Sequence, residues 1–181
     1  MTIRNPWTRI STRLVYENAW IKVREDQVLS PSGKPGIYGV VEPRIAVGVV
    51  ALTDAHEIFL VGQYRYPLDV YSWEIPEGGG EEDEPALVTA QRELREETGL
   101  LATSWDTLGA EVHVSNCHSS ERGFLFIARG LTQAEAAPDE TELLQLKKVP
   151  FRDALKMVED GTITDGLSII AILKTARLLG M

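Results

Sequence analysis

Residues 78–100 read GGGEEDEPALVTAQRELREETGL and carry the most constrained pattern in this chain. Pro85 stands where a helix would begin, since proline is favoured at the first helical position. Gly99 stands where that helix would end, as a left-handed cap. Apolar residues recur at helical spacing between these positions and predict one stripe that faces the core, formed by Leu87, Ala90 and Leu94.

Three glutamates share one face of this predicted helix. Glu93 and Glu97 are four residues apart, so their side chains stack, and Glu96 lies beside them. Arg92 can pair with Glu96 across one turn, whereas like charges on one face destabilise a helix by about a few tenths of a kcal/mol per pair. A hard divalent cation would offset this repulsion, because Mg²⁺ prefers carboxylate oxygens. The alternative interpretation is a solvated acidic face.

The order of these residues resembles the signature of the Nudix hydrolase family at every constrained position. The matching residues are Gly78, Glu84, Arg92, Glu93, Leu94, Glu96, Glu97, Gly99 and Leu100. Two flanking segments, QYRYP at 63–67 and WEIPEG at 73–78, are similar to the ADP-ribose and nucleoside-diphosphate-sugar pyrophosphatase branch. The resemblance implies an α/β (α+β) fold, with a mixed β-sheet sandwich between helices. It also implies an N-terminal antiparallel strand region (1–41) for dimerisation and the base pocket, followed by the hydrolase domain (42–181).

The resemblance implies a chemistry as well. It predicts metal-dependent hydrolysis of the diphosphate linkage of nucleoside-diphosphate sugars of the ADP-ribose, GDP-mannose or UDP-glucose type. The products would be a nucleoside monophosphate and a sugar phosphate, and the cofactor Mg²⁺ or Mn²⁺. The implied metal ligands are Glu77 (through its backbone carbonyl), Glu93, Glu97 and Glu142. The implied catalytic residues are Glu140 as the general base, Glu96 and Arg92; the implied substrate contacts are Arg44, Arg65, Ser115, Asn116, Glu121 and Trp20.

Several of these roles have structural alternatives. Arg65 could pair with Asp69 or Glu74 on the surface, and Trp20 could be a core aromatic residue. Glu140 could belong to an acidic surface loop, with Glu142 as the alternative base. Members of the branch that are specific for ADP-ribose tend to carry a proline where this chain has Asn116. The asparagine argues against strict specificity for ADP-ribose and favours a nucleoside-diphosphate sugar as the substrate.

Composition narrows the classes of protein. The 181 residues carry a net charge of −9, which argues against a nucleic-acid partner because that partner selects a basic surface. Cys117 is the single cysteine, so an intrachain disulfide is impossible and a reducing, cytoplasmic location fits. The longest apolar run, 45–52, is too short to span a membrane, and the first seven residues lack an apolar signal core. We expect a homodimer with no membrane partner.

The remaining pattern predicts strands and two further helices. Strands are expected at 13–27, 36–41, 73–75, 105–114, 123–128 and 144–149, and a buried hairpin at 45–52 and 57–63 with its turn at 53–56. Residues 132–142 are acidic and loop-like, and helices are expected at 151–159 and 166–179. Two other functions stay open: a non-catalytic nucleotide-sugar sensor, and a house-cleaning nucleoside triphosphate pyrophosphatase.

Overall fold

The computed structural model describes residues 4–134 and 143–181. The chain divides into two compact units. The first contains the residues up to 44 together with 115–122, and the second contains 45–114 and 123–181. Among the helices of the described residues, none combines the length and the apolar character needed to cross a membrane.

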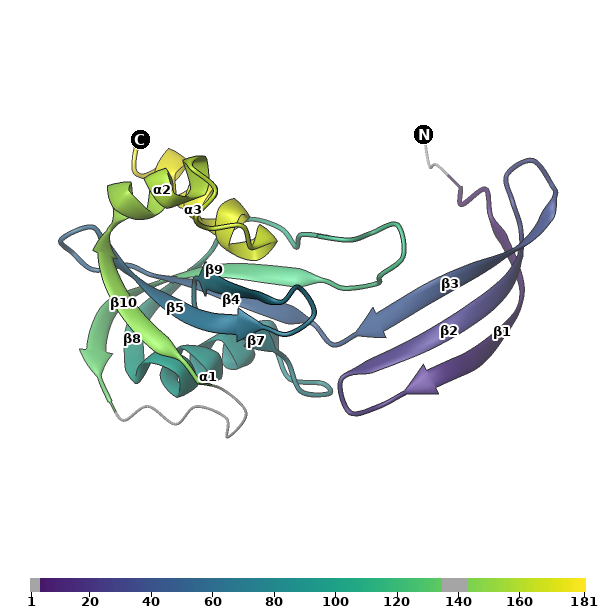
Figure 1. Cartoon of the computed structure of the whole chain (residues 1–181), viewed down its shortest axis with the longest axis horizontal. Helices are drawn as coiled ribbons and strands as arrows, with labels where there is room; N and C mark the ends of the chain where they lie inside the picture. Colours follow the sequence, from purple (N-terminus) through teal and green to yellow (C-terminus); the bar gives the residue numbers. More distant parts are fainter. Residues whose placement is uncertain (1–3, 135–142) are drawn as a thin grey trace. The chain divides into compact units, whose positions relative to one another are not determined.

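The first unit is built on a three-stranded antiparallel sheet (Figure 1). Its strands, in spatial order, are β1 (Thr8–Glu17), β2 (Ile21–Leu29) and β3 (Pro35–Pro43). The segment 115–122 joins this unit through Val41, whose N–H donates to His118 O at 2.8 Å and whose carbonyl accepts from Ser120 N at 3.0 Å.

The expectation of one strand over 13–27 is wrong, because the chain turns between β1 and β2. Asn18 causes the turn: its side-chain oxygen accepts from the N–H groups of Trp20 at 2.9 Å and Ile21 at 2.8 Å. An asparagine that bonds its own downstream backbone in this way competes with strand pairing.

The described residues of the second unit form two sheets and three helices (Figure 1). One sheet has the order β7 (Glu77–Gly79), β4 (Ala46–Ala51), β9 (Gly123–Gln133), β8 (Leu100–Thr107), in which β4 and β9 run parallel. The other has the order β10 (Gln145–Pro150), β5 (Glu57–Arg65), β6 (Val70–Glu74). The helices are α1 (Ala86–Thr98), α2 (Phe151–Glu159) and α3 (Gly166–Leu178). The predicted mixed α+β architecture is confirmed.

The hairpin predicted from 45–52 and 57–63 is wrong, because β4 and β5 belong to different sheets. They meet only at the turn, where Leu52 bridges Ile58 and Thr53 N donates to Glu57 O at 2.9 Å. Both edges of β4 are already taken by β7 and β9, so β5 pairs with β6 and β10 instead.

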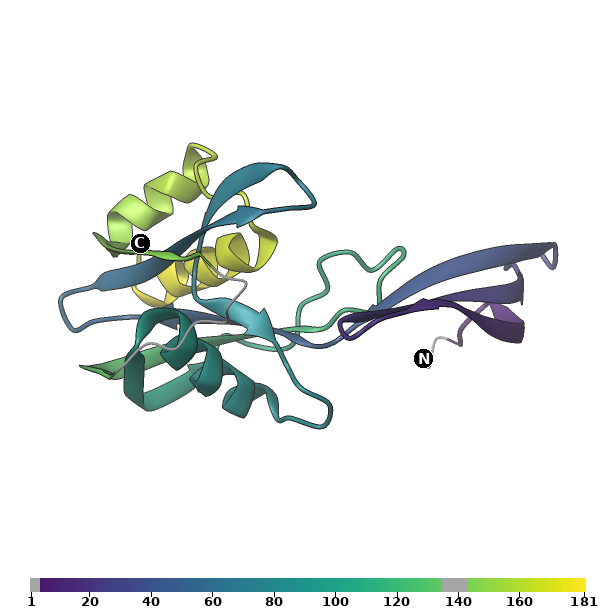
Figure 2. The same cartoon turned by 60° about the horizontal axis from the view of Figure 1, so that its bottom comes forward.

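Strand β4 separates two hydrophobic cores, because successive side chains of a strand point to opposite faces. Val47, Val49 and Ala51 pack with Ala90 and Leu94 of α1. The alternate residues Val50 and Leu52 pack with α3 and α2. Figure 2 shows α1 and α3 on opposite sides of this sheet.

Helix α1 has nearly the predicted bounds. Pro85 is the residue before its first turn, and Gly99 ends it in the left-handed region at φ 68°, with its N–H bonded to Arg95 O at 2.8 Å. The predicted apolar stripe is wrong at Leu87, which is 39% exposed, whereas Ala90 and Leu94 are fully buried. Helix α2 has the predicted bounds and α3 ends one residue early, while the strand expected at 105–114 is shifted to Leu100–Thr107.

Candidate active site

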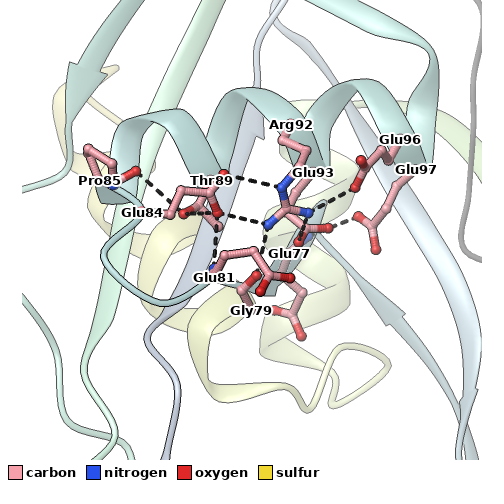
Figure 3. Close-up of polar contacts among 10 residues, drawn as sticks. All are labelled: Glu77, Gly79, Glu81, Glu84, Pro85, Thr89, Arg92, Glu93, Glu96 and Glu97. Atoms are coloured by element: carbon pink, nitrogen blue, oxygen red, sulfur yellow. Dashed lines mark hydrogen bonds and ion pairs between the residues drawn. The ribbon is translucent and has the colours of Figure 1, made fainter. Parts of the chain in front are cut away.

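Arg92 is the centre of the polar network on α1 (Figure 3). Its Nη1 donates to Glu93 Oε1 at 2.7 Å and to Glu96 Oε2 at 2.9 Å. Its Nη2 donates to Gly79 O at 2.9 Å and to Glu84 Oε2 at 3.1 Å. One guanidinium therefore fixes Glu93 and Glu96 against the glycine-rich segment that precedes the helix, and the predicted pairing with Glu96 is present.

Glu84 is held on the other side of this guanidinium. It also accepts from Thr89 Oγ1 at 2.9 Å and from Glu81 N at 3.1 Å. The hydrogen bond from Arg92, together with those from the Glu81 backbone and Thr89, lowers the pKa of Glu84 to about 2. Glu84 is therefore an ionised anchor of Arg92 at neutral pH.

Glu93 and Glu97 are buried carboxylates, only 8% and 6% exposed. Glu97 Oε2 accepts from the backbone N–H of Glu77 at 3.0 Å, which places it beside β7. A Cβ on Gly78 would overlap the carboxylate of Glu93, so this glycine leaves the space that Glu93 fills. Glu96 lies nearer to solvent, with 36% of its side chain exposed.

These residues fit a hard divalent cation. Mg²⁺ and Mn²⁺ select carboxylate and carbonyl oxygens, and α1 and β7 provide both kinds at one place. The glycine at position 78 is the feature that allows a buried carboxylate to come so close to a backbone. The predicted ligands Glu93, Glu97 and Glu77 are therefore neighbours.

Arg65 lies in a second polar cluster of the same unit. Its Nε donates to Glu74 Oε1 at 2.9 Å, and its Nη2 lies 2.5 Å from both Glu74 Oε2 and Glu77 Oε1. The alternative pairing of Arg65 with Glu74 is present, although Glu74 is buried and does not lie on the surface. Asp69 accepts a hydrogen bond from Tyr64 instead. The guanidinium is held by two carboxylates.

Asp165 is the functional candidate that sequence reasoning missed. It caps α3, accepting from Ser168 N at 2.7 Å, and its carboxylate lies near those of Glu74 and Glu77. Burial, followed by the charges of Asp165 and Glu74, raises the pKa of Glu77 well above its ordinary value. The available signal was an aspartate directly before Gly166 and an apolar helical run, which is a helix start but not in itself a site.

The predicted substrate contacts of the first unit lie on its turns and on the 115–122 segment. Trp20 is 73% exposed in the β1–β2 turn, so the core alternative is wrong for it. Arg44 is exposed directly after β3, and Asn116 is exposed on the segment, where Ser115 and Glu121 are half-buried. Glu140 and Glu142 lie outside the described residues.

The first unit also has a hollow of about 420 Å³. Its lining includes Trp7 and Tyr38, which pack edge to face with their ring centroids 5.5 Å apart, and the ion pair between Arg24 and Asp26. Trp20 is not part of this lining.

Comparison with known proteins defines the class. Residues 42–165 match the family model described as NUDIX domain, and residues 7–41 match the model described as nucleoside diphosphate sugar hydrolase N-terminal domain. The chain therefore belongs to the Nudix hydrolase family.

Several curated proteins are similar over most of their length. An ADP-ribose pyrophosphatase of Bacillus subtilis (strain 168) is 33% identical over 165 residues, covering 90% of this chain and 89% of that protein. An ADP-ribose pyrophosphatase of Mycobacterium tuberculosis is 33% identical over 168 residues, covering 91% and 80%. A methanol dehydrogenase activator of Bacillus methanolicus is 33% identical over 165 residues, covering 90% and 89%. A crystal structure of an ADP compounds hydrolase has the same fold, with a TM-score of 0.86 at 20% identity over 99% of this chain and 97% of that one.

Proposed function

We propose that this protein hydrolyses the diphosphate linkage of nucleoside-diphosphate sugars to a nucleoside monophosphate and a sugar phosphate. One observation carries the proposal: a nucleoside diphosphate sugar hydrolase N-terminal module is followed directly by a Nudix domain whose signature carboxylates are all present. Arg92 bonds Glu84, Glu93 and Glu96, and the backbone N–H of Glu77 bonds Glu97. The names of the two pyrophosphatases, each 33% identical, place ADP-ribose first among the substrates to test. Other nucleoside-diphosphate sugars are tested as well, because Asn116 stands where ADP-ribose-specific members of the branch tend to carry proline.

The α1 carboxylates would hold the cation. Glu93 and Glu97, with the backbone carbonyl of Glu77, are the proposed ligands for Mg²⁺ or Mn²⁺. When bound there, the ion neutralises phosphate charge and orients the diphosphate. Arg92 keeps Glu93 and Glu96 in fixed positions, because it bonds both carboxylates and the Gly79 carbonyl at once.

Arg65 is the proposed diphosphate contact. A guanidinium can grip two phosphate oxygens with parallel hydrogen bonds. Its present partners, Glu74 and Glu77, hold it in place until an anion competes for its donors.

Glu140 is the proposed general base. A water that attacks phosphorus must lose a proton as the new P–O bond forms and the bridging P–O bond breaks, and a carboxylate that binds a cation is a poor base. An acid from a separate segment is therefore needed, and Glu140, with Glu142 as the alternative, is the position that matches the family.

We also propose that the protein is a homodimer formed through its first 41 residues. The three-stranded sheet there exposes large apolar side chains, including Ile10 at 62%, Leu14 at 55% and Ile37 at 66%. Exposed apolar area of this kind favours association, and two-fold pairs are the commonest assemblies. Light scattering that gives the mass of one chain at micromolar concentration would contradict this. The cytoplasmic location and the lack of a nucleic-acid partner stay predictions.

A substrate panel tests the proposed function. ADP-ribose, GDP-mannose, UDP-glucose and oxidised nucleoside triphosphates are each incubated with the protein, Mg²⁺ and a phosphatase that acts only on the monoester products. We expect phosphate release from at least one nucleotide sugar and none in excess EDTA. Turnover of triphosphates alone would favour the house-cleaning alternative, and binding without turnover would favour a sensor.

A further inference from the structure

Acidic side chains lie on both faces of strand β7. Gly78 faces Glu93 on α1, so the neighbouring side chain of Glu77 points to the opposite face. There it meets Glu74 at the end of β6 and Asp165 at the start of α3. One oxygen from each of these three carboxylates lies within 4.8 Å of the others. We call these three residues the α3-side cluster.

The α3-side cluster has more negative charge than its protein partners neutralise. Arg65 is the cation paired with it among the described residues, so three carboxylates and one guanidinium leave a formal charge of −2 when all are ionised. Glu74 is only 1% exposed. Buried like charges without compensation are costly, so a cluster of this kind requires a further positive charge or a proton.

A second observation points to a ligand for this cluster. The side chain of Glu77 is 9% exposed, and its Oε1 is the atom that pairs with Arg65. Within the described part of the chain its other oxygen, Oε2, is buried and has no hydrogen-bond partner. Buried carboxylate oxygens are almost always satisfied, so an unpaired one beside two other carboxylates is a candidate ligand atom.

The cluster is also rigidly assembled. Asp165 is fixed by its capping bond to Ser168 N at 2.7 Å, and Ser168 Oγ accepts from Ile75 N at 3.0 Å. Ser168 therefore ties the start of α3 to the segment between Glu74 and Glu77. Ligands that are positioned before binding lose less entropy when an ion arrives.

We propose that Glu74, Glu77 and Asp165 form a second site for a hard divalent cation such as Mg²⁺ or Mn²⁺, distinct from the α1 carboxylates. Oxygen-only ligands select this class of ion. The ion would neutralise the formal charge of −2 and join β6, β7 and α3.

Counting bound Mn²⁺ tests this site. The full-length protein is stripped with chelator, dialysed and titrated with Mn²⁺, while the free ion is measured by its electron paramagnetic resonance signal. Asp165→Asn is the main variant, because asparagine caps a helix as well as aspartate does and the fold should survive. Glu77→Gln is the second, since it keeps the side-chain volume and the backbone carbonyl. Asp160→Asn is the matched control: Asp160 is the C-cap residue that follows α2, accepts a hydrogen bond from Thr162 N and lies outside the cluster.

We expect Asp165→Asn and Glu77→Gln to bind one Mn²⁺ fewer than the wild type, or to bind it at least about tenfold more weakly. Asp160→Asn should match the wild type. Glu97→Gln, which weakens the α1 site, should still show the second ion, and adding Asp165→Asn to it should remove that ion. If both cluster variants keep wild-type stoichiometry and affinity, the cluster holds a proton instead and the proposal is wrong. Turnover is not measured, so a failure of the proposed function leaves this result unchanged.

Discussion

Replacing Gly78 with alanine tests the close approach of β7 to α1. The new Cβ would overlap the Glu93 carboxylate, which must move by roughly 1 Å to restore ordinary van der Waals contact. Glu93 is not free to move, because it is 8% exposed and its Oε1 lies 2.7 Å from Arg92 Nη1. Gly79→Ala is the matched control: a Cβ there would meet nothing closer than Ile45 O at 3.9 Å.

The cost of Gly78→Ala can be worked from these contacts. Weakening one charged hydrogen bond and straining one rotamer should lower the free energy of unfolding by about 1–3 kcal/mol. That corresponds to a fall in Tm of about 2–12 °C for a chain of this size. Displacing a metal ligand by roughly 1 Å should lower kcat about 10²-fold.

Thermal unfolding with and without Mg²⁺, and turnover of the best substrate in the panel, measure both effects. The two alanine variants lose the same conformational entropy in the unfolded chain, so their difference isolates the contact with Glu93. Equal Tm values and equal kcat for Gly78→Ala and Gly79→Ala would refute the reasoning.

Four further substitutions test the site. Glu97→Gln keeps an oxygen that can accept from Glu77 N, so it should stay folded while kcat falls by about 10²–10⁴, as circular dichroism and initial rates would report. Arg65→Ala should raise KM more than it lowers kcat, and it should destabilise the protein by about 3–5 kcal/mol in urea because buried Glu74 loses its partner; a pure kcat loss would place Arg65 at the developing charge instead. Glu84 has a folded-state pKa of about 2, below its ordinary value of 4.5, so its stabilising effect is complete above about pH 4.5 and is lost as the pH falls toward 2. The difference in the free energy of unfolding between wild type and Glu84→Gln, measured by urea titration, should therefore shrink over that pH range. A constant difference would contradict the pairing of Glu84 with Arg92. Glu140→Gln should bind substrate and metal normally in calorimetry while kcat falls by about 10²–10⁴, whereas full activity would remove Glu140 as the base.

The parts of the fold that follow from local sequence were predictable. Helix α1 could be placed because Pro85 and Gly99 mark its ends through backbone conformation alone. The local sequence could not show that β4 and β5 do not form a hairpin. The partner of a strand depends on which sheet edges other strands already occupy, and those strands are distant in sequence. Leu87 fits a helical apolar period but is exposed, since the core on that side is filled by Ala90 and Leu94.

The site was predictable where one helix or one signature brings residues together. Arg92, Glu93, Glu96 and Glu97 are neighbours because helical spacing makes them so. The α3-side cluster unites residues from two strands and a helix start that are about 90 positions apart in sequence, as the contact between Ile75 and Ser168 shows. The proximity of these residues depends on how the sheets and helices pack together, and no periodicity in the sequence encodes that packing.

The first unit is made of two separate segments of the chain, and this limits how it can be exchanged between related proteins. The chain passes from one unit to the other three times, after residues 44, 114 and 122, whereas the matched N-terminal family model ends at residue 41. A gene fusion that replaced only residues 1–44 would separate the 115–122 segment from its native partner. The carbonyl of His118 and the N–H of Ser120 in that segment both bond the backbone of Val41. The unit that can be exchanged is therefore the three-stranded sheet β1–β2–β3 together with the 115–122 segment. Recombination at a single crossover cannot transplant it, so chimaeras between relatives should carry both pieces from the same parent.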